Sequence, residues 1–265
     1  MKRGWRWSDV IGLAVTLVAL SSVAIMQRRS LETLQDPSGQ VLTEAEYQRQ
    51  TAQTIAQMEA LAKLPALGFD NLVSDWAFLQ FLQFFGDSDA RRVTGYDQVP
   101  AFFRVIVAKD PRFVQSYPYL STAITVYASQ PKTSVELMAQ GLAHLDPHYQ
   151  PSAYLVWVFR AMDELLFLGQ GLAAAQSYNR AAEWAELQTD PHIREAAPYY
   201  RSLAQTLRND PDSRMAQINA WIWALVNAVS DRSRETAIEN IERLGGEVSR
   251  LPDGSWQIRH PEDLR

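Results

Sequence analysis

The chain has 265 residues and a formal net charge of −5, with 47% hydrophobic, 11% aromatic and 21% charged residues. This composition supports a folded core and excludes a largely disordered or collagen-like chain. The absence of cysteine excludes disulfides, thiolate metal sites, iron–sulfur clusters and cysteine nucleophiles.

The charge is unevenly distributed along the chain. Residues 1–29 carry five basic side chains against Asp9, a net of +4, so residues 30–265 carry −9. The phosphate backbone of nucleic acids requires clustered Lys and Arg, which an acidic body does not offer. We therefore expect no nucleic-acid partner.

The first thirty residues contain an apolar segment. Val10 to Met26 is a run of seventeen residues without a charge. As a helix it spans roughly 25 Å, close to the lower limit for crossing a bilayer core. Tryptophans beside basic residues, as found just before it, are typical of a membrane-interface anchor. We predict that residues 1–29 form a single-pass anchor in contact with the bilayer through residues 10–26, with anchor positions at Trp5, Trp7, Val10, Leu17 and Ile25.

The alternative is a cleaved secretory signal, for which Ser22 and Ala24 supply small residues at a cleavage site. Against cleavage, the apolar run continues through Met26 and is followed directly by Arg28 and Arg29. More basic residues precede the segment than follow it. The positive-inside rule therefore weakly favours a body on the non-cytoplasmic side.

A linker over residues 30–43 precedes a long helical region, residues 44–245. Thr43 begins a Thr-Glu-Ala-Glu capping box, which predicts a helix that must end before Pro65. Short links between the elements favour antiparallel neighbours and hence an all-α helical array. The predicted helices cover residues 44–64, 70–85, 97–109, 114–128, 133–145, 152–168, 172–187, 193–208, 213–229 and 232–244.

The dipeptide Asp-Pro recurs at the ends of predicted helices. It occurs at 110–111, 146–147, 190–191 and 210–211; the first two copies are 36 residues apart and the second and third are 44 apart. Proline ends the preceding helix and suits the start of the next one. Spacing in this range is typical of a two-helix structural repeat.

The segment GQGLAAAQSYNRAAEWAEL and the helix before it resemble a tetratricopeptide-like repeat. In that family, small residues and aromatics interlock two antiparallel helices. The resemblance covers roughly residues 97–210 and implies a right-handed α-solenoid with an inner groove. The matching positions are Ala174, Tyr178 and Ala181 against Tyr154, Trp157 and Ala161, and more loosely Tyr119, Ala123, Val135 and Ala139 in the preceding unit.

The C-terminal region, residues 246–265, changes character. The turn sequence Pro252-Asp253-Gly254 separates two short extended runs, 247–251 and 255–258, and predicts a β-hairpin. An isolated hairpin is marginally stable in water. The apolar hairpin residues are therefore expected to pack against the last helix: Val248, Leu251, Trp256 and Ile258.

The helix over 70–85 contains a candidate partner-binding surface. Asp75, Trp76, Gln80 and Gln83 form a polar strip on a different face from the aromatic ridge of Phe78, Phe81 and Phe85. Such a strip is suited to binding a partner helix. The alternative is a core helix whose glutamines simply face water.

Trp221 and Trp223 form a second candidate partner-binding pair. Two residues apart, they lie on nearly opposite sides of a helix, so both cannot face one core. One of them is free to contact the hairpin, another repeat or a partner. Alternatively, each fills a different internal interface of the array.

We expect no catalytic, cofactor-binding or metal-binding residues. Asp163 and Glu164 point about 100° apart, so one should face solvent while the other pairs with Arg160 or Arg180. Pro147 interrupts the helix that would align His144 with His148 as metal ligands. The chain also lacks the glycine-rich phosphate loops, the GxSxG motif and the HExxH motif.

Membrane-anchored tetratricopeptide proteins assist the assembly of respiratory or photosynthetic complexes, and this chain looks like one of them. The resemblance implies a membrane-tethered scaffold or assembly factor whose protein partners are embedded in the membrane or associated with it. A permanent structural subunit of a large membrane complex is the alternative. A membrane-tethered enzyme is a third possibility, and it would require a pocket with convergent carboxylates or histidines, for example around Asp163 or Asp75.

Overall fold

The computed structural model describes residues 21, 42–251 and 254–261. The chain divides into two units, residues 1–43 and 44–265. Apart from Ser21, the predicted anchor lies outside the described residues, and so do its positions Trp5, Trp7, Val10, Leu17 and Ile25. In the part of the chain that is described, no helix combines the length and the apolarity needed to span a bilayer.

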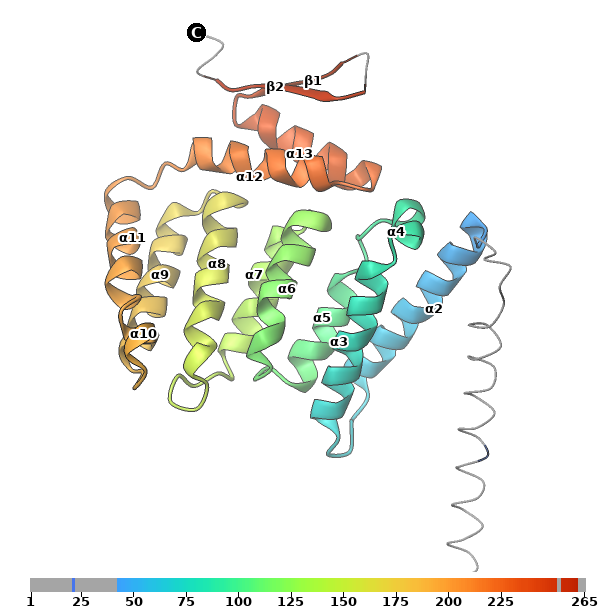
Figure 1. Ribbon diagram of the computed structural model, residues 1–265, viewed down its shortest axis with the longest axis horizontal. Helices are drawn as coiled ribbons and strands as arrows, with labels where there is room; N and C mark the ends of the chain where they lie inside the picture. Colours follow the sequence, from blue (N-terminus) through green and yellow to red (C-terminus); the bar gives the residue numbers. More distant parts are fainter. Residues whose placement is uncertain (1–20, 22–41, 252–253, 262–265) are drawn as a thin grey trace, which may run out of the picture. The chain divides into compact units, whose positions relative to one another are not determined.

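The second unit is helical except for a C-terminal hairpin, which confirms the predicted all-α class (Figure 1). Its α-helices are α2 (Glu44–Lys63), α3 (Asp70–Gly86), α4 (Ser88–Thr94), α5 (Pro100–Lys109), α6 (Tyr117–Leu120), α7 (Pro131–Leu142), α8 (Tyr154–Leu166), α9 (Gly171–Glu186), α10 (Pro191–Arg194), α11 (Ala197–Asn209), α12 (Arg214–Asn227) and α13 (Asp231–Arg243). Two 3₁₀ turns, η1 (Val114–Ser116) and η3 (Pro151–Ala153), a π-helix, η2 (Ser121–Tyr127), and strands β1 (Glu247–Arg250) and β2 (Trp256–Arg259) complete it.

Consecutive helices pack side by side, as in a helical repeat. Helix α5 packs against α2 and α3, α7 packs between η2 and α8, and α9 packs between α8 and α11. Helices α12 and α13 pair with each other and lie across the ends of the others, where α12 contacts η2 and α8 (Figure 1). One edge of the array is therefore covered by a differently oriented helix pair.

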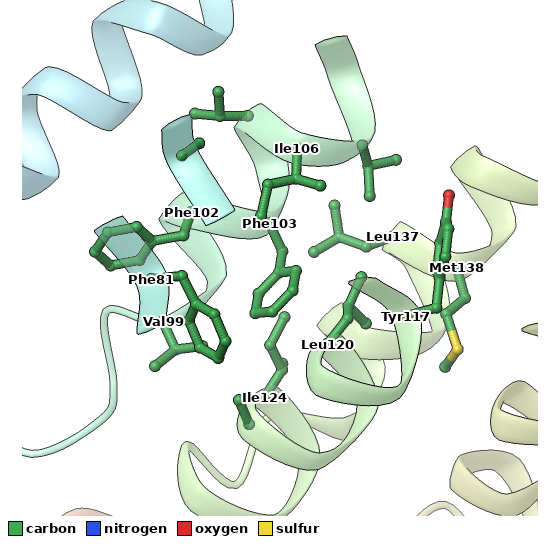
Figure 2. Close-up of a cluster of buried hydrophobic side chains, with 14 of the residues drawn as sticks. Phe81, Val99, Phe102, Phe103, Ile106, Tyr117, Leu120, Ile124, Leu137 and Met138 are labelled. Atoms are coloured by element: carbon green, nitrogen blue, oxygen red, sulfur yellow. The ribbon is translucent and has the colours of Figure 1, made fainter. Parts of the chain in front are cut away.

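The largest core cluster joins α3, α5, α6, η2 and α7 (Figure 2). Its fully buried side chains include Phe81, Phe103, Ile124 and Met138, each from a different element. An amphipathic helix pair cannot cover its own apolar face, so stacking on its neighbours supplies the stability. Close packing also explains Gly141, where an added Cβ would lie 1.7 Å from the hydroxyl oxygen of Tyr117.

The four Asp-Pro dipeptides share one hydrogen bond. In each, the aspartate Oδ1 accepts from the backbone N–H two residues later, at 3.0 Å for Asp110, 2.9 Å for Asp146, 2.9 Å for Asp190 and 3.2 Å for Asp210. This Asx turn satisfies an amide at the start of the next segment, while the proline ends the helix before it. The repeated motif is thus a repeated turn.

The pair α8–α9 packs as the repeat resemblance implies. Ala174, Tyr178 and Ala181 are buried in one cluster with Ala161, and Tyr154 and Trp157 pack against that cluster. Alanines at these positions let the two helices approach closely.

The predicted hairpin is present. Strands β1 and β2 pair antiparallel, with Val248 opposite Ile258. Val248, Trp256 and Ile258 pack against the cluster of α12 and α13, as expected. The expectation for Leu251 was wrong: its side chain is 38% exposed and lies outside that cluster, because it follows β1 where the chain enters the turn.

Four helical segments differ from the sequence prediction. The helix predicted over 193–208 is divided into α10 and α11. Helix α4 was not predicted, and α5 begins at Pro100 rather than at Asp97. The segment expected to be one helix over 114–128 is instead divided into the 3₁₀ turn η1, the short helix α6 and the π-helix η2.

Candidate partner-binding site

Helix α3 is apolar around most of its circumference. Ser74, Ala77, Phe81 and Phe84 are buried on its inner side. Its outer side also carries large apolar residues, whose exposed fractions are 65% for Leu72, 38% for Trp76, 57% for Leu79 and 40% for Leu82. A helix that is apolar all round is normally covered on all sides, so this exposed side has the character of a binding surface. We call Leu72, Asp75, Trp76, Leu79, Leu82 and Gln83 the outer face of α3.

The predicted strip lies on or beside this outer face. Asp75, Trp76 and Gln83 are exposed, and Gln80 is half-buried. The aromatic ridge turns inward, since Phe78 packs edge-to-face on Phe113 and Phe85 packs on Tyr127. The structure thus separates the strip from the ridge, as the helical spacing implied.

The strip leads into a polar pocket of about 220 Å³ between α2, α3 and α4. Gln80 and Gln83 line the pocket from α3, about one and two turns beyond Trp76. The other lining residues are Tyr47, Gln50, Thr51 and Thr54 of α2, Phe84 of α3, Asp87 at the start of α4, and Ala90 and Arg91 of α4. Amides and hydroxyls dominate this lining, so the pocket offers hydrogen bonds rather than apolar contact.

Arg91 is the feature of this pocket that sequence reasoning missed. Only 3% of the residue is exposed, and its guanidinium carbon lies 3.3 Å from the centre of the Phe84 ring. Its Nη1 donates to the Gly95 carbonyl at 3.1 Å, while its buried Nε has no hydrogen-bond partner. Burial lowers the pKa of Arg91 to about 10, and the nearby charges of Asp87 and Tyr96 oppose this shift.

An apolar groove of about 330 Å³ lies on the other side of α3. Phe81 and Phe85 line it from α3, and Tyr119 and Tyr127 line it from α6 and η2, together with Pro118, Thr122 and Ala123. Aromatic walls favour apolar side chains. Helix α3 is therefore flanked by one polar and one apolar hollow.

The two candidate tryptophans have different environments. Trp221 is 2% exposed and packs edge-to-face on Phe167, so its side chain belongs to the core. Trp223 is 50% exposed on the opposite side of α12. Of this pair, only Trp223 offers surface to a partner.

Asp163 lies at the centre of a buried polar cluster. Its carboxylate accepts from the hydroxyls of Ser121 at 2.9 Å, Thr125 at 2.7 Å and Ser134 at 2.6 Å. Ser121 and Thr125 belong to η2 and Ser134 belongs to α7, so this one carboxylate joins both elements to α8. Burial raises the pKa of Asp163 to about 7, with the three hydroxyl hydrogen bonds acting in the opposite direction.

The expectation that one of the adjacent acids faces solvent was therefore wrong, since Asp163 and Glu164 are each only 2% exposed. Glu164 accepts from Arg160 Nε at 2.7 Å, as the sequence suggested, and from Ser177 Oγ at 2.7 Å. Both carboxylates are occupied by protein donors. This arrangement joins helices and presents no open acid to a substrate.

His144 and His148 are exposed. Within the described ranges, no group of three or more acidic or histidine side chains is arranged to hold a metal ion.

Comparison with known proteins returns no match at any of three levels: no family model fits the chain, and no curated protein and no solved structure is similar to it.

Proposed function

We propose that this protein is a membrane-tethered scaffold or assembly factor that binds a partner protein on the outer face of α3. The proposal includes a single-pass anchor over residues 10–26 and a tetratricopeptide-like solenoid as the body. The partner is a protein embedded in the same membrane or associated with it.

The observation that carries the proposal is the exposure of Leu72, Trp76 and Leu79 on a helix that is apolar around most of its circumference. Fully burying one such leucine contributes about 1.5–3 kcal/mol. The two leucines and Trp76, left in water, form a surface that a partner's apolar residues can cover. The i, i+4, i+7 spacing of these three residues suits a partner helix lying along α3.

The tether would strengthen this binding without adding any contact. An anchor ending near residue 26 and a body beginning at Glu44 leave a linker that reaches at most about 60 Å. Confinement to that distance raises the effective concentration of the binding face for membrane partners. A weak apolar surface is then sufficient for specific assembly.

The buried acids argue against an enzymatic alternative. A tethered enzyme would need Asp163 or Asp75 in a pocket with convergent acids, but Asp163 is enclosed by three hydroxyls. Asp75 is exposed on the outer face of α3 and lines neither neighbouring hollow. Among the described residues, the polar pocket has Asp87 as its one acidic lining residue, and the apolar groove has none. The interaction role fits these residues better.

The test is chemical cross-linking in native membranes, followed by mass spectrometry, for the parent chain and the variants Trp76→Ala and Gln80→Ala. We expect Trp76→Ala to lower the yield of the principal partner at least tenfold, because a central aromatic contact contributes about 2 kcal/mol or more. Tyr149→Ala, a change of an exposed aromatic residue between α7 and η3 that belongs to neither candidate surface, serves as the control and should leave the partner set unchanged.

A partner set that is identical in all three variants and the parent would refute the binding face. The same experiment separates the two interaction roles. An assembly factor is recovered with incomplete intermediates, whereas a permanent subunit is recovered in fixed stoichiometry with the complete complex.

A further inference from the structure

The pocket between α2, α3 and α4 contains a buried cation without an anionic partner. Arg91 is 3% exposed, and in the part of the chain that the structure describes it forms no ion pair. Its Nε has no hydrogen-bond partner. A guanidinium cannot lose its proton in ordinary conditions, so its burial remains costly until an acceptor is supplied.

The nearest acid does not fill this role. Asp87 lines the same pocket, but its Oδ1 accepts from the backbone N–H of Ala90 at 3.0 Å and so caps α4. Its charge still acts on the pocket. With Asp87 beside Arg91, the site suits a ligand with one negative charge better than a dianion such as phosphate.

The remaining lining supplies neutral donors to the same pocket. Gln80 and Gln83 present amides from α3, and Thr51 and Tyr47 present hydroxyls from α2. Arginine with neighbouring amide and hydroxyl donors is the arrangement that recognises a carboxylate. The cavity of about 220 Å³ is large enough for the end of one side chain.

The pocket also continues the outer face of α3. Trp76 is four residues before Gln80 and seven before Gln83, so the three lie along one side of the helix. A partner segment covering Trp76 would bring its next turn over the pocket mouth. A side chain from the middle of that segment, rather than its chain end, is then positioned to enter.

We infer that this pocket binds the side-chain carboxylate of an Asp or Glu in the partner segment that covers the outer face of α3. The inference rests on the proposed function for the existence of that partner, and it adds the partner's chemistry. The expected recognition sequence is an amphipathic helix with apolar anchors and an acidic residue about one turn beyond them.

The inference can be tested with small probes and no partner. The full chain in lipid nanodiscs, labelled with ¹⁵N-arginine, is titrated with acetyl-glutamate amide, whose only carboxylate is the side chain. The controls are acetyl-glutamine amide, acetyl-alanine with a free carboxyl end, and inorganic phosphate, all at constant ionic strength. The Arg91 Nε–H signal is assigned from its loss in Arg91→Lys.

We expect a saturable shift of this signal with the glutamate probe and none with the glutamine probe. Gln83→Ala should weaken the binding about tenfold, the effect of losing one hydrogen bond to a charged group. Gln57→Ala, which changes an exposed glutamine of α2 outside the pocket lining, should leave it unchanged. Because Gln83 is exposed, its variant should fold, and this keeps the test independent of any damage in Arg91→Lys.

No shift with the glutamate probe, or a larger effect of phosphate or acetyl-alanine, would overturn the inference. These results are separable from the cross-linking test. If the glutamate probe binds but no partner is cross-linked to α3, the pocket is a carboxylate site and the proposed function is wrong. If a partner is cross-linked to α3 but the glutamate probe does not bind, the proposed function stands and the inference of an acidic residue in the partner is wrong.

Discussion

At the scale of single residues, the buried side chains of Asp163 and Arg91 have different roles, one in the stability of the fold and one in the proposed recognition of a partner. Asp163 has three hydroxyl donors and so is fully satisfied, which makes it a structural connection between η2, α7 and α8. Arg91 lacks an acceptor at Nε and faces a pocket, which makes it a recognition group. The difference between the two lies in their hydrogen bonds and not in their burial.

Replacing Asp163 should destabilise the fold. Asp163→Ala leaves the hydroxyls of Thr125 and Ser134 buried without their acceptor, so we expect a loss of about 2–4 kcal/mol in the free energy of unfolding. Chemical unfolding followed by circular dichroism measures it. Asp75→Ala, at an exposed position, should change stability by less than about 0.5 kcal/mol. Equal effects of the two substitutions would contradict the connecting role.

Asp163 should also make stability depend on pH. Its folded pKa of about 7 lies above the ordinary value of 3.8, so between these values the folded protein binds the proton more tightly than the unfolded chain. The free energy of unfolding should therefore fall as pH rises from about 4 to about 7 and become level above that. Asp163→Asn should remove this contribution. The free energy of unfolding of both proteins is measured across that pH range. If the two plots of free energy against pH are parallel, Asp163 does not titrate in this window.

At the scale of elements, the recurring sequence motif of this chain lies in the turns and not in the helices. Each Asp-Pro dipeptide forms the same Asx hydrogen bond, although the helices on either side differ in length and composition. The proline stops one helix and the aspartate prepares the start of the next. The regular spacing seen in the sequence is thus a spacing of turns.

Removing one of these aspartates should cost about 1 kcal/mol, the usual effect of losing a capping side chain. We expect this of Asp190→Ala, because Asp190 caps α10 through the His192 amide. Asp190→Asn keeps an acceptor oxygen and should cost only a few tenths of that amount. Thermal unfolding of the two variants measures the difference. If Asn is as damaging as Ala, the charge or the backbone, rather than the hydrogen bond, is responsible.

The turn between α2 and α3 offers a test of backbone strain. Leu67 has a φ of 52°, in the left-handed region that a leucine occupies at a cost of roughly 1 kcal/mol. Its side chain is 85% exposed, so little packing is lost when it is removed. Leu67→Gly should be at least as stable as the parent, and Leu67→Val should be less stable by about 1 kcal/mol. A clear loss of stability in Leu67→Gly would mean that the leucine side chain makes a contact worth more than the strain.

At the scale of the whole molecule, helical periodicity and Asp-Pro spacing are sufficient to predict an all-α array, and the Pro-Asp-Gly turn sequence predicts the terminal hairpin. The resemblance to a tetratricopeptide-like repeat adds the packing of α8 against α9, in which the small residues Ala174 and Ala181 are buried. Helix α4 is not predictable in this way, since SDARRVT has no apolar period and depends on the cap from Asp87.

The candidate site likewise contains residues that the sequence predicts and residues that it does not. Trp76, Gln80 and Gln83 could be found from the sequence because they share one side of one helix. The role of Arg91 could not, because its surroundings come from three different helices. Asp163 and its hydroxyl donors are 29 to 42 residues apart in sequence, so no local pattern reveals their contact.

The central claim is that the outer face of α3 binds a partner, and the absence of native cysteine allows a direct test. Leu79→Cys and Leu172→Cys each give the full chain a single thiol, at positions 57% and 58% exposed, for a photoreactive maleimide label. After illumination in native membranes, we expect one discrete cross-linked product from position 79 and none from position 172. Equal labelling from both positions, or no product from position 79, would contradict the account.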